Sequence, residues 1–203
     1  VKMSTDEVYG DIQEGSFDEE SELNPSNPYA ATKAAADLFL KSWARTHGLD
    51  YLILRPSNNY GMFQYHEKLI PLAVKRLKEG KLIKLHDRGK PIRTWTHVED
   101  TVNAVILLVE QADRNRIYNI SSEFEQNNFD TVQKIINCFF MGRARVNVPD
   151  YMKYVDFGYE RPGQDVRYSI SCNYLKQYGW SASKVFDQEI NDIVKHYREK
   201  FIW

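Results

Sequence analysis

Residues 27–54, NPYAATKAAADLFLKSWARTHGLDYLIL, contain a helix and a strand whose order indicates the fold class. Asn27 is a favourable N-cap, and Pro28 suits the first helical position, where no backbone N–H is needed. Apolar residues then recur at helical spacing until Gly48, a residue type that commonly ends helices. The apolar run at 51–54 predicts a short buried strand. With a strand in front of the helix, this order is the strand–helix–strand unit of a parallel sheet.

The first ten residues supply that earlier strand and the polar motif that follows it. Residues 1–3 are typical of the end of a buried parallel strand. The motif Ser4-Thr5-Asp6-Glu7-Val8-Tyr9-Gly10 comes next and combines hydroxyls, two adjacent carboxylates and a phenol. Open α/β sheets bind ligands at the carboxyl ends of their strands, so we expect this motif to lie in a functional site.

The remaining elements extend the α/β pattern and then depart from it. We predict helices over 70–79, 97–111, 131–140, 173–178 and 187–201, and strands over 82–85, 92–96 and 117–120. Residues 10–26 are expected to form a polar loop, and residues 141–170 an irregular segment. The prediction is an α/β protein: the C-terminal part of a Rossmann-like, doubly wound parallel sheet with a smaller mixed substrate-binding lobe.

The predicted domain division follows from this order. Residues 1–80, with about 92–120 returning, are assigned to the second half of the Rossmann-like domain. Residues 81–91 and about 121–203 are assigned mainly to the substrate-binding lobe and closing helices.

The amino-acid composition limits the classes of partner that this chain is expected to bind. The 27 basic and 28 acidic residues give a net charge of −1, which favours neither nucleic acid nor an anionic membrane as partner. No apolar run approaches the roughly 18–20 residues of a membrane span. Cys138 and Cys172 are far apart and lack redox spacing, and the histidines lack metal-ligand spacing. We therefore expect reduced thiols, a cytoplasmic protein and no metal site.

Two groups of residues suggest proton transfer, although each has an ordinary structural interpretation. Tyr29 and Lys33 are four residues apart and share one helix face, where an ammonium can lower the pKa of a phenol and hold a ribose hydroxyl. Asp6 and Glu7 can supply one acid and one base if their environments differ. The alternatives are an ordinary helical pair and a solvated acidic turn, and spacing by itself does not decide between them.

These motifs resemble the NDP-glucose 4,6-dehydratases, a family of the extended short-chain dehydrogenase/reductase class. The resemblance extends over nearly the whole chain, because family motifs follow in order at 4–10, 28–33, 57–61, 67–71, 92–95, 98–100, 118–120 and 161–168. The Asp6-Glu7 doublet favours dehydration over related decarboxylation or epimerisation.

The resemblance implies an NAD-dependent hydro-lyase that converts dTDP-glucose to its 4-keto-6-deoxy form, a precursor of rhamnose-type sugars. Tyr29 would take the proton of the 4-hydroxyl, with Thr5 holding the 4-oxygen. Lys33 would lower the pKa of Tyr29 and bind the nicotinamide ribose. Glu7 would remove the C5 proton, and Asp6 would protonate the departing 6-hydroxyl.

The resemblance also implies binding residues. Those expected to contact NAD are Ser4, Tyr29, Lys33 and Asn58. Those expected to contact the nucleotide-sugar are Asn58, Glu67, Lys68, Leu69, Pro71, His86, Arg93, Asn128, Arg161 and Tyr168. The family usually has Asp at Thr94, often Tyr at His86 and often His at Gln164, so thymine and uracil both stay open as the base.

Several alternatives stay open at this point. The enzyme could be a UDP-glucose 4,6-dehydratase, a decarboxylase or an epimerase, or the chain could be a non-catalytic sugar-nucleotide-binding protein. The glycine-rich turn that binds the NAD pyrophosphate in this family does not occur in these 203 residues, which suggests a fragment. Family members usually pair through their long helices, so a homodimer is expected.

Overall fold

The computed structural model describes residues 1–141, 150–159 and 165–200, and the chain separates into two compact units. The first unit contains Val1–Asn59, Ile92–Glu125 and Gly163–Ser183. The second contains Tyr60–Pro91, Gln126–Pro162 and Lys184–Trp203. These bounds differ from the expected division at residue 80. The chain leaves each unit and returns to it, because the packing partners of a segment are distant in sequence.

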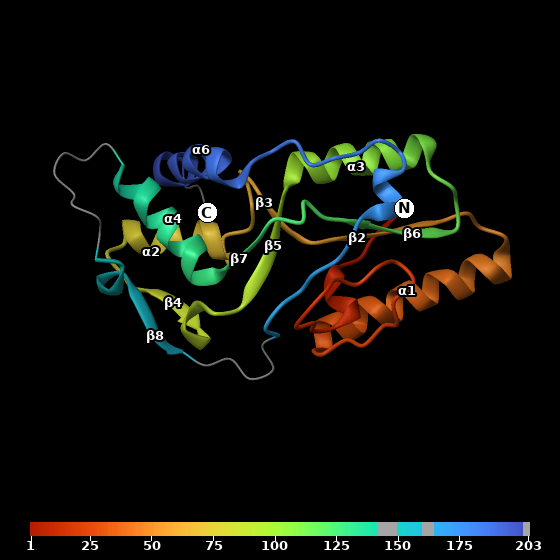
Figure 1. The fold of residues 1–203 in the computed structure, drawn as a ribbon, viewed down its shortest axis with the longest axis horizontal. Coiled ribbons are helices and arrows are strands. Elements are labelled where there is room, and N and C mark those ends of the chain that lie inside the picture. Colours follow the sequence, from red (N-terminus) through yellow and green to blue (C-terminus); the bar gives the residue numbers. More distant parts are fainter. Residues whose placement is uncertain (142–149, 160–164, 201–203) are drawn as a thin grey trace. The chain divides into compact units, whose positions relative to one another are not determined.

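A parallel sheet forms the centre of the first unit, as the sequence predicts. Its strands are β1 (Lys2–Met3), β2 (Leu52–Pro56) and β6 (Arg116–Ile120), in the order β1-β2-β6. Both pairings are parallel, with Lys2 opposite Ile53 and Ile53 opposite Ile117. The connection from β1 to β2 contains α1 (Pro28–His47), and α3 (Val98–Gln111) lies on the opposite side of the sheet from α1 (Figure 1).

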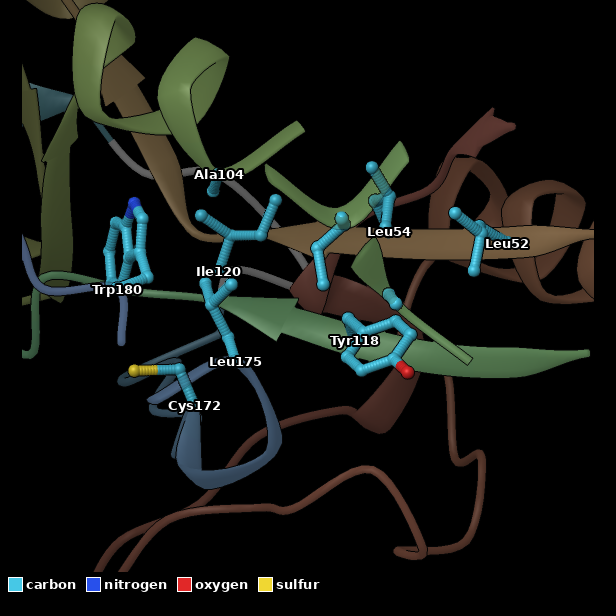
Figure 2. Close-up of a cluster of buried hydrophobic side chains, with 10 residues drawn as sticks. Leu52, Leu54, Ala104, Tyr118, Ile120, Cys172, Leu175 and Trp180 are labelled. Carbon is cyan, nitrogen blue, oxygen red and sulfur yellow. The ribbon is translucent and has the colours of Figure 1, made fainter. Parts of the chain in front are cut away.

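One face of this sheet is apolar. Alternate residues of a strand point to opposite faces, and Leu52, Leu54 and Ile120 are almost fully buried on the same one. They pack with Ala104 and Leu108 of α3. The cluster is completed by Tyr118, Ala112, Cys172, Leu175 and Trp180, of which Leu175 belongs to α5 (Asn173–Lys176) (Figure 2). The segment from Cys172 to Trp180 therefore belongs to the first unit, because it covers this face.

Three short strands form a further sheet in the order β3-β5-β7. They are β3 (Asn58–Tyr60), β5 (Ile92–His97) and β7 (Glu125–Asn127). Of these, only β5 was predicted, since three-residue polar segments carry no period that sequence reasoning can detect.

The second unit combines three helices with a two-stranded parallel sheet. The helices are α2 (Leu69–Lys78), α4 (Asn128–Phe140) and α6 (Phe186–Glu199), which contact one another. The strands are β4 (Ile83–His86) and β8 (Val155–Tyr159). The expectation that 141–170 is irregular was wrong at β8. Its sequence includes Asp156 and Gly158, which disfavour strands, and its pairing with β4 overrides that preference.

None of the described helices is long and apolar enough to cross a membrane.

Candidate functional site

The polar motif after β1 folds into a short turn of helix, η1 (Asp6–Tyr9). Thr5 caps it: the Glu7 N–H donates to Thr5 Oγ1 (3.3 Å), and Thr5 Oγ1 donates to Asp6 Oδ1 (3.2 Å). Gly10 ends the turn with φ 88°, and a Cβ there would lie 2.3 Å from the carbonyl oxygen of Asn24. Only glycine fits this close approach. The turn therefore holds the two carboxylates directly beyond the end of the strand.

The two adjacent carboxyl groups have different surroundings. Asp6 is buried, and burial, followed by the charge of Glu7, raises its pKa from 3.8 to about 7, against the opposing effects of Thr5 and Arg93. Asp6 Oδ2 is buried with no hydrogen-bond partner among the described residues. Glu7 is half-buried, and its Oε2 accepts a hydrogen bond from Asn27 Nδ2 (3.3 Å). A carboxyl group that keeps its proton near neutrality thus lies beside one held by an amide, which is an acid–base arrangement.

Tyr29 and Lys33 lie on the first turns of α1, which begins as predicted. Asn27 Oδ1 accepts a hydrogen bond from the Ala30 N–H (2.9 Å), and Pro28 occupies the first turn. The pKa of Tyr29 is affected by the charges of Glu7 and Asp6 and by the Thr5 hydroxyl, so these groups are close to the phenol. The structure thereby brings Thr5, Asp6, Glu7 and Tyr29 together.

The predicted effect of Lys33 on the pKa of Tyr29 is not among the effects that the described residues exert in this structure. The pKa of Tyr29 is raised rather than lowered, first by burial and then by the negative charges of Glu7 and Asp6. Lys33 is not among the groups that shift it, because its Nζ donates to the carbonyl oxygen of Met3 (2.8 Å). In this conformation the Lys33 ammonium donates its hydrogen bond to the backbone of β1 and not to the Tyr29 phenol.

A buried carboxylate that sequence reasoning missed joins the helix to the strand. Asp37 is fully buried, and its Oδ2 accepts hydrogen bonds from Ser4 Oγ (2.9 Å) and from Arg55 Nε and Nη2 (3.1 and 3.0 Å). Lys2 pairs with its Oδ1. The sequence does contain a signal for it: Asp37 is an acidic residue on the same side of the helix as the small apolar residues Ala30, Ala34 and Ala44. Ser4, predicted to contact NAD, directs its hydroxyl into this network.

Arg93 and Tyr168, both predicted to bind substrate, contact each other. The Arg93 guanidinium carbon is 4.7 Å from the centre of the Tyr168 ring, and Nη2 donates to the carbonyl oxygen of Asp165 (3.1 Å). Burial lowers the pKa of Arg93, while the charges of Tyr168, Asp6 and Glu7 raise it. Asp165 Oδ2 also accepts hydrogen bonds from Tyr168 and from Ser26 (2.6 Å). The sequence analysis did not predict Asp165 and Ser26 as parts of this cluster, although Asp165 lies in the family motif at 161–168.

Asn58 provides a buried polar atom that is free to bind a ligand. It lies in β3, and its Oδ1 has no hydrogen-bond partner among the described residues. A buried acceptor, an exposed phenol on Tyr29 and an ammonium on Lys33 are the groups that fit the amide and ribose of a nicotinamide nucleotide. The residues present therefore fit this end of NAD. The hydroxyl of Ser4, which was also predicted to contact NAD, donates a hydrogen bond to Asp37 in this structure.

The other predicted substrate residues belong to the second unit. Glu67 and Lys68 precede α2, and Leu69 and Pro71 lie in its first turn. His86 ends β4, and Asn128 begins α4, where its N–H donates to the carbonyl oxygen of Pro91 (3.0 Å). Arg161 lies outside the described residues. Within the described part of the chain, no group of three or more His, Cys, Asp or Glu side chains is arranged to hold a metal ion.

Comparison with known proteins decides the family. The family described as GDP-mannose 4,6 dehydratase matches residues 1–193. The chain belongs to this family. Its fold agrees, because solved members of the same class superpose on it: a dTDP-glucose 4,6-dehydratase from Streptomyces venezuelae with NAD and TYD bound gives a TM-score of 0.90 at 35% identity, and covers 98% of this chain and 59% of that one.

Other proteins that are similar to this chain carry the names of related sugar-nucleotide enzymes. The dTDP-glucose 4,6-dehydratase of Haemophilus influenzae is 39% identical over 202 residues, which are 96% of this chain and 59% of that protein. A UDP-glucose 4-epimerase from Thermus thermophilus, solved with NAD, has a TM-score of 0.84 at 25% identity and covers 98% and 63% of the two chains. The chain thus spans about three-fifths of the length of these relatives.

Proposed function

We propose that this protein catalyses the NAD-dependent dehydration of dTDP-glucose to dTDP-4-keto-6-deoxyglucose. The observation that carries the proposal is the difference between the adjacent carboxyl groups of Asp6 and Glu7 beside the Tyr29 phenol. Removal of water across C5 and C6 needs one base and one acid at neighbouring positions, and the η1 turn holds one of each. Relatives 33–39% identical to this chain carry the name dTDP-glucose 4,6-dehydratase, which supports the choice of substrate.

The first step is oxidation at C4. Tyr29 takes the proton of the 4-hydroxyl, and Thr5, whose hydroxyl acts on the Tyr29 phenol, holds the same oxygen. NAD, held by Tyr29, Lys33 and Asn58, would supply the hydride acceptor for C4 and the hydride source for C6. Because Tyr29 is protonated in the present conformation, we infer that Lys33 leaves the Met3 carbonyl and turns toward the phenol when the site is filled.

The second step is elimination. The 4-ketone acidifies the C5 proton, which Glu7 removes. Asp6 gives its proton to the departing 6-hydroxyl, and that group leaves as water. The raised pKa of Asp6 suits this role, since the group keeps its proton up to about pH 7. The returning hydride at C6 and a proton at C5 complete the 4-keto-6-deoxy sugar, so the reaction consumes no net oxidant.

The residues predicted to bind the nucleotide-sugar keep that assignment in this proposal. Arg93 and Tyr168 interact electrostatically with Glu7, and guanidinium groups suit a diphosphate because they form forked hydrogen bonds. Glu67, Lys68, Leu69, Pro71, His86, Asn128 and Arg161 keep their predicted roles at the diphosphate and nucleotide. Tyr29, Lys33 and Asn58 are assigned to the nicotinamide end of NAD.

We further propose a cytoplasmic homodimer. The outward side of α1 exposes large apolar side chains, among them Leu38 (57%), Phe39 (64%) and Trp43 (47%). A second copy of the helix is a fitting cover for such a patch, because like surfaces form isologous dimers. Cys138 and Cys172 are both unpaired, which suits a reducing compartment.

The proposal is tested by an assay of the protein, expressed from its whole open reading frame, with NAD and either dTDP-glucose or UDP-glucose. We expect the 4-ketone to form faster from dTDP-glucose. Glu7→Gln removes the base, so we expect water loss to fall by about 100-fold or more while hydride transfer to NAD stays measurable. A ketone formed from neither sugar would contradict the proposed function, and normal product formation by Glu7→Gln would contradict the role of Glu7.

A further inference from the structure

A single side chain connects the start of α1 to Glu7. Asn27 Oδ1 accepts a hydrogen bond from the Ala30 N–H (2.9 Å), and Asn27 Nδ2 donates to Glu7 Oε2 (3.3 Å). We propose that Asn27 is a positioning residue for Glu7, which orients the carboxylate for removal of the C5 proton. This inference rests on the proposed function, and it assigns Asn27 a role beyond capping the helix.

The cap determines which end of the amide faces Glu7. The N-cap position needs an acceptor directed at the open N–H groups of the first turn, and Asn27 Oδ1 fills that need. The NH₂ group is then directed away from the helix, toward Glu7. A reversed amide would lose the cap and would set an oxygen against a carboxylate. The helix that carries Tyr29 therefore also fixes the donor that reaches Glu7.

The charges around Glu7 make such a donor useful. Asp6 and the phenols of Tyr29 and Tyr168 interact electrostatically with it, and none of these brings positive charge. Arg93 is a cation that interacts electrostatically with Glu7, but two of its guanidinium nitrogens donate to the carbonyl oxygens of Ile92 and Asp165. Asn27 supplies an N–H directly to the carboxylate without adding charge to the site.

The consequence is specific to one step. A hydrogen bond to the ionised form of a carboxyl group favours that form and restricts its orientation. A base must be ionised and must be aimed at its proton, so elimination depends on both effects. Oxidation at C4 uses Tyr29 and Thr5, and it does not require the Glu7 carboxylate. Loss of the Asn27 donor should therefore slow water loss without slowing hydride transfer from C4.

Two substitutions separate the bond to Glu7 from the helix cap. Asn27→Ser keeps a capping oxygen but lacks the N–H that reaches Glu7. Single-turnover measurements with dTDP-glucose and NAD should show water loss slowed by about tenfold and reduction of NAD unchanged. Asn27→Asp keeps the cap but sets a second carboxylate against Glu7, so the loss should be larger and should lessen at lower pH. Thr46→Ala, in the last turns of the same helix, is the control and should match the unmodified protein.

An NMR signal gives a readout that does not depend on turnover. The ¹³C signal of the Glu7 carboxyl group should change position in Asn27→Ser at a fixed pH, because the carboxylate loses the Asn27 N–H donor. Equal loss of both steps in Asn27→Ser would show that Asn27 is a helix cap alone and would overturn the proposal. Unchanged water loss or an unchanged Glu7 carboxyl signal would overturn it as well. If the unmodified protein forms no ketone, the proposed function fails, and the carboxyl signal still decides whether Asn27 contacts the Glu7 carboxylate.

Discussion

The two faces of the β1-β2-β6 sheet are built from alternate residues of the same strands, yet they bury different chemistry. Leu54 faces the apolar cluster beneath α3, whereas its neighbour Arg55 forms hydrogen bonds with Asp37 of α1. Likewise Ile120 belongs to the apolar cluster, while the side chain of Asn119 accepts a hydrogen bond from Tyr9 of the η1 turn (2.9 Å). Apolar packing has no direction, but hydrogen-bonded charges fix distance and angle.

This difference suggests a division of labour. The apolar face supplies stability, and the polar face sets the position of the helix that carries Tyr29 and Lys33 relative to β1, which ends at Met3. Two predictions test the two faces of the sheet, and a third tests the carboxyl group of Asp6.

The largest effect is expected from Asp37→Ala. The substitution leaves the buried Arg55 guanidinium and Lys2 without their partner, and an uncompensated buried charge destabilises a protein by roughly 3–5 kcal/mol. Urea unfolding measures this loss. The exposed Asp192→Ala is the control and should change the free energy of unfolding by less than about 0.5 kcal/mol. A loss below about 1 kcal/mol for Asp37→Ala would show that the polar face is not a constraint.

A smaller loss is expected from Leu54→Ala on the apolar face. Removal of a fully buried leucine side chain leaves a cavity, and the free energy of unfolding should fall by about 2–4 kcal/mol. The folded fraction should keep its turnover, since the bonds around Asp37 stay in place. Leu82→Ala, at an exposed position outside the apolar patch of α1, is the matched control. A drop in turnover per folded molecule would show that the two faces are not independent.

The third prediction concerns Asp6, and its effect depends on pH. The folded pKa of Asp6, about 7, lies above 3.8, so the unfolded chain loses this proton first, and the contribution of Asp6 to stability falls as pH rises from about 4 to about 7. Asp6→Asn cannot ionise. At pH 8 it should therefore be more stable than the unmodified protein, with no gain at pH 4. Melting temperatures across this range measure the effect, and an equal gain at both pH values would contradict the assigned pKa.

The sequence by itself determined much of the frame. Asn27, Pro28 and Gly48 predicted α1 with its observed start and end, and the apolar run after it predicted β2. These local signals act within a few residues, so they can be read without knowledge of the fold. The order of motifs also indicated the family, and it singled out the acidic doublet together with Tyr29 and Lys33.

Only the tertiary structure decided what surrounds each of these groups. Asp6 and Glu7 are neighbours of the same charge, and sequence cannot tell which of them is buried. Lys33 was expected to act on Tyr29, but it bonds the Met3 carbonyl, which lies 30 residues away. β8 is a strand although its own sequence disfavours one, because it pairs with β4. In each case the deciding partner is distant along the chain, and burial and charge depend on those distant partners rather than on local sequence.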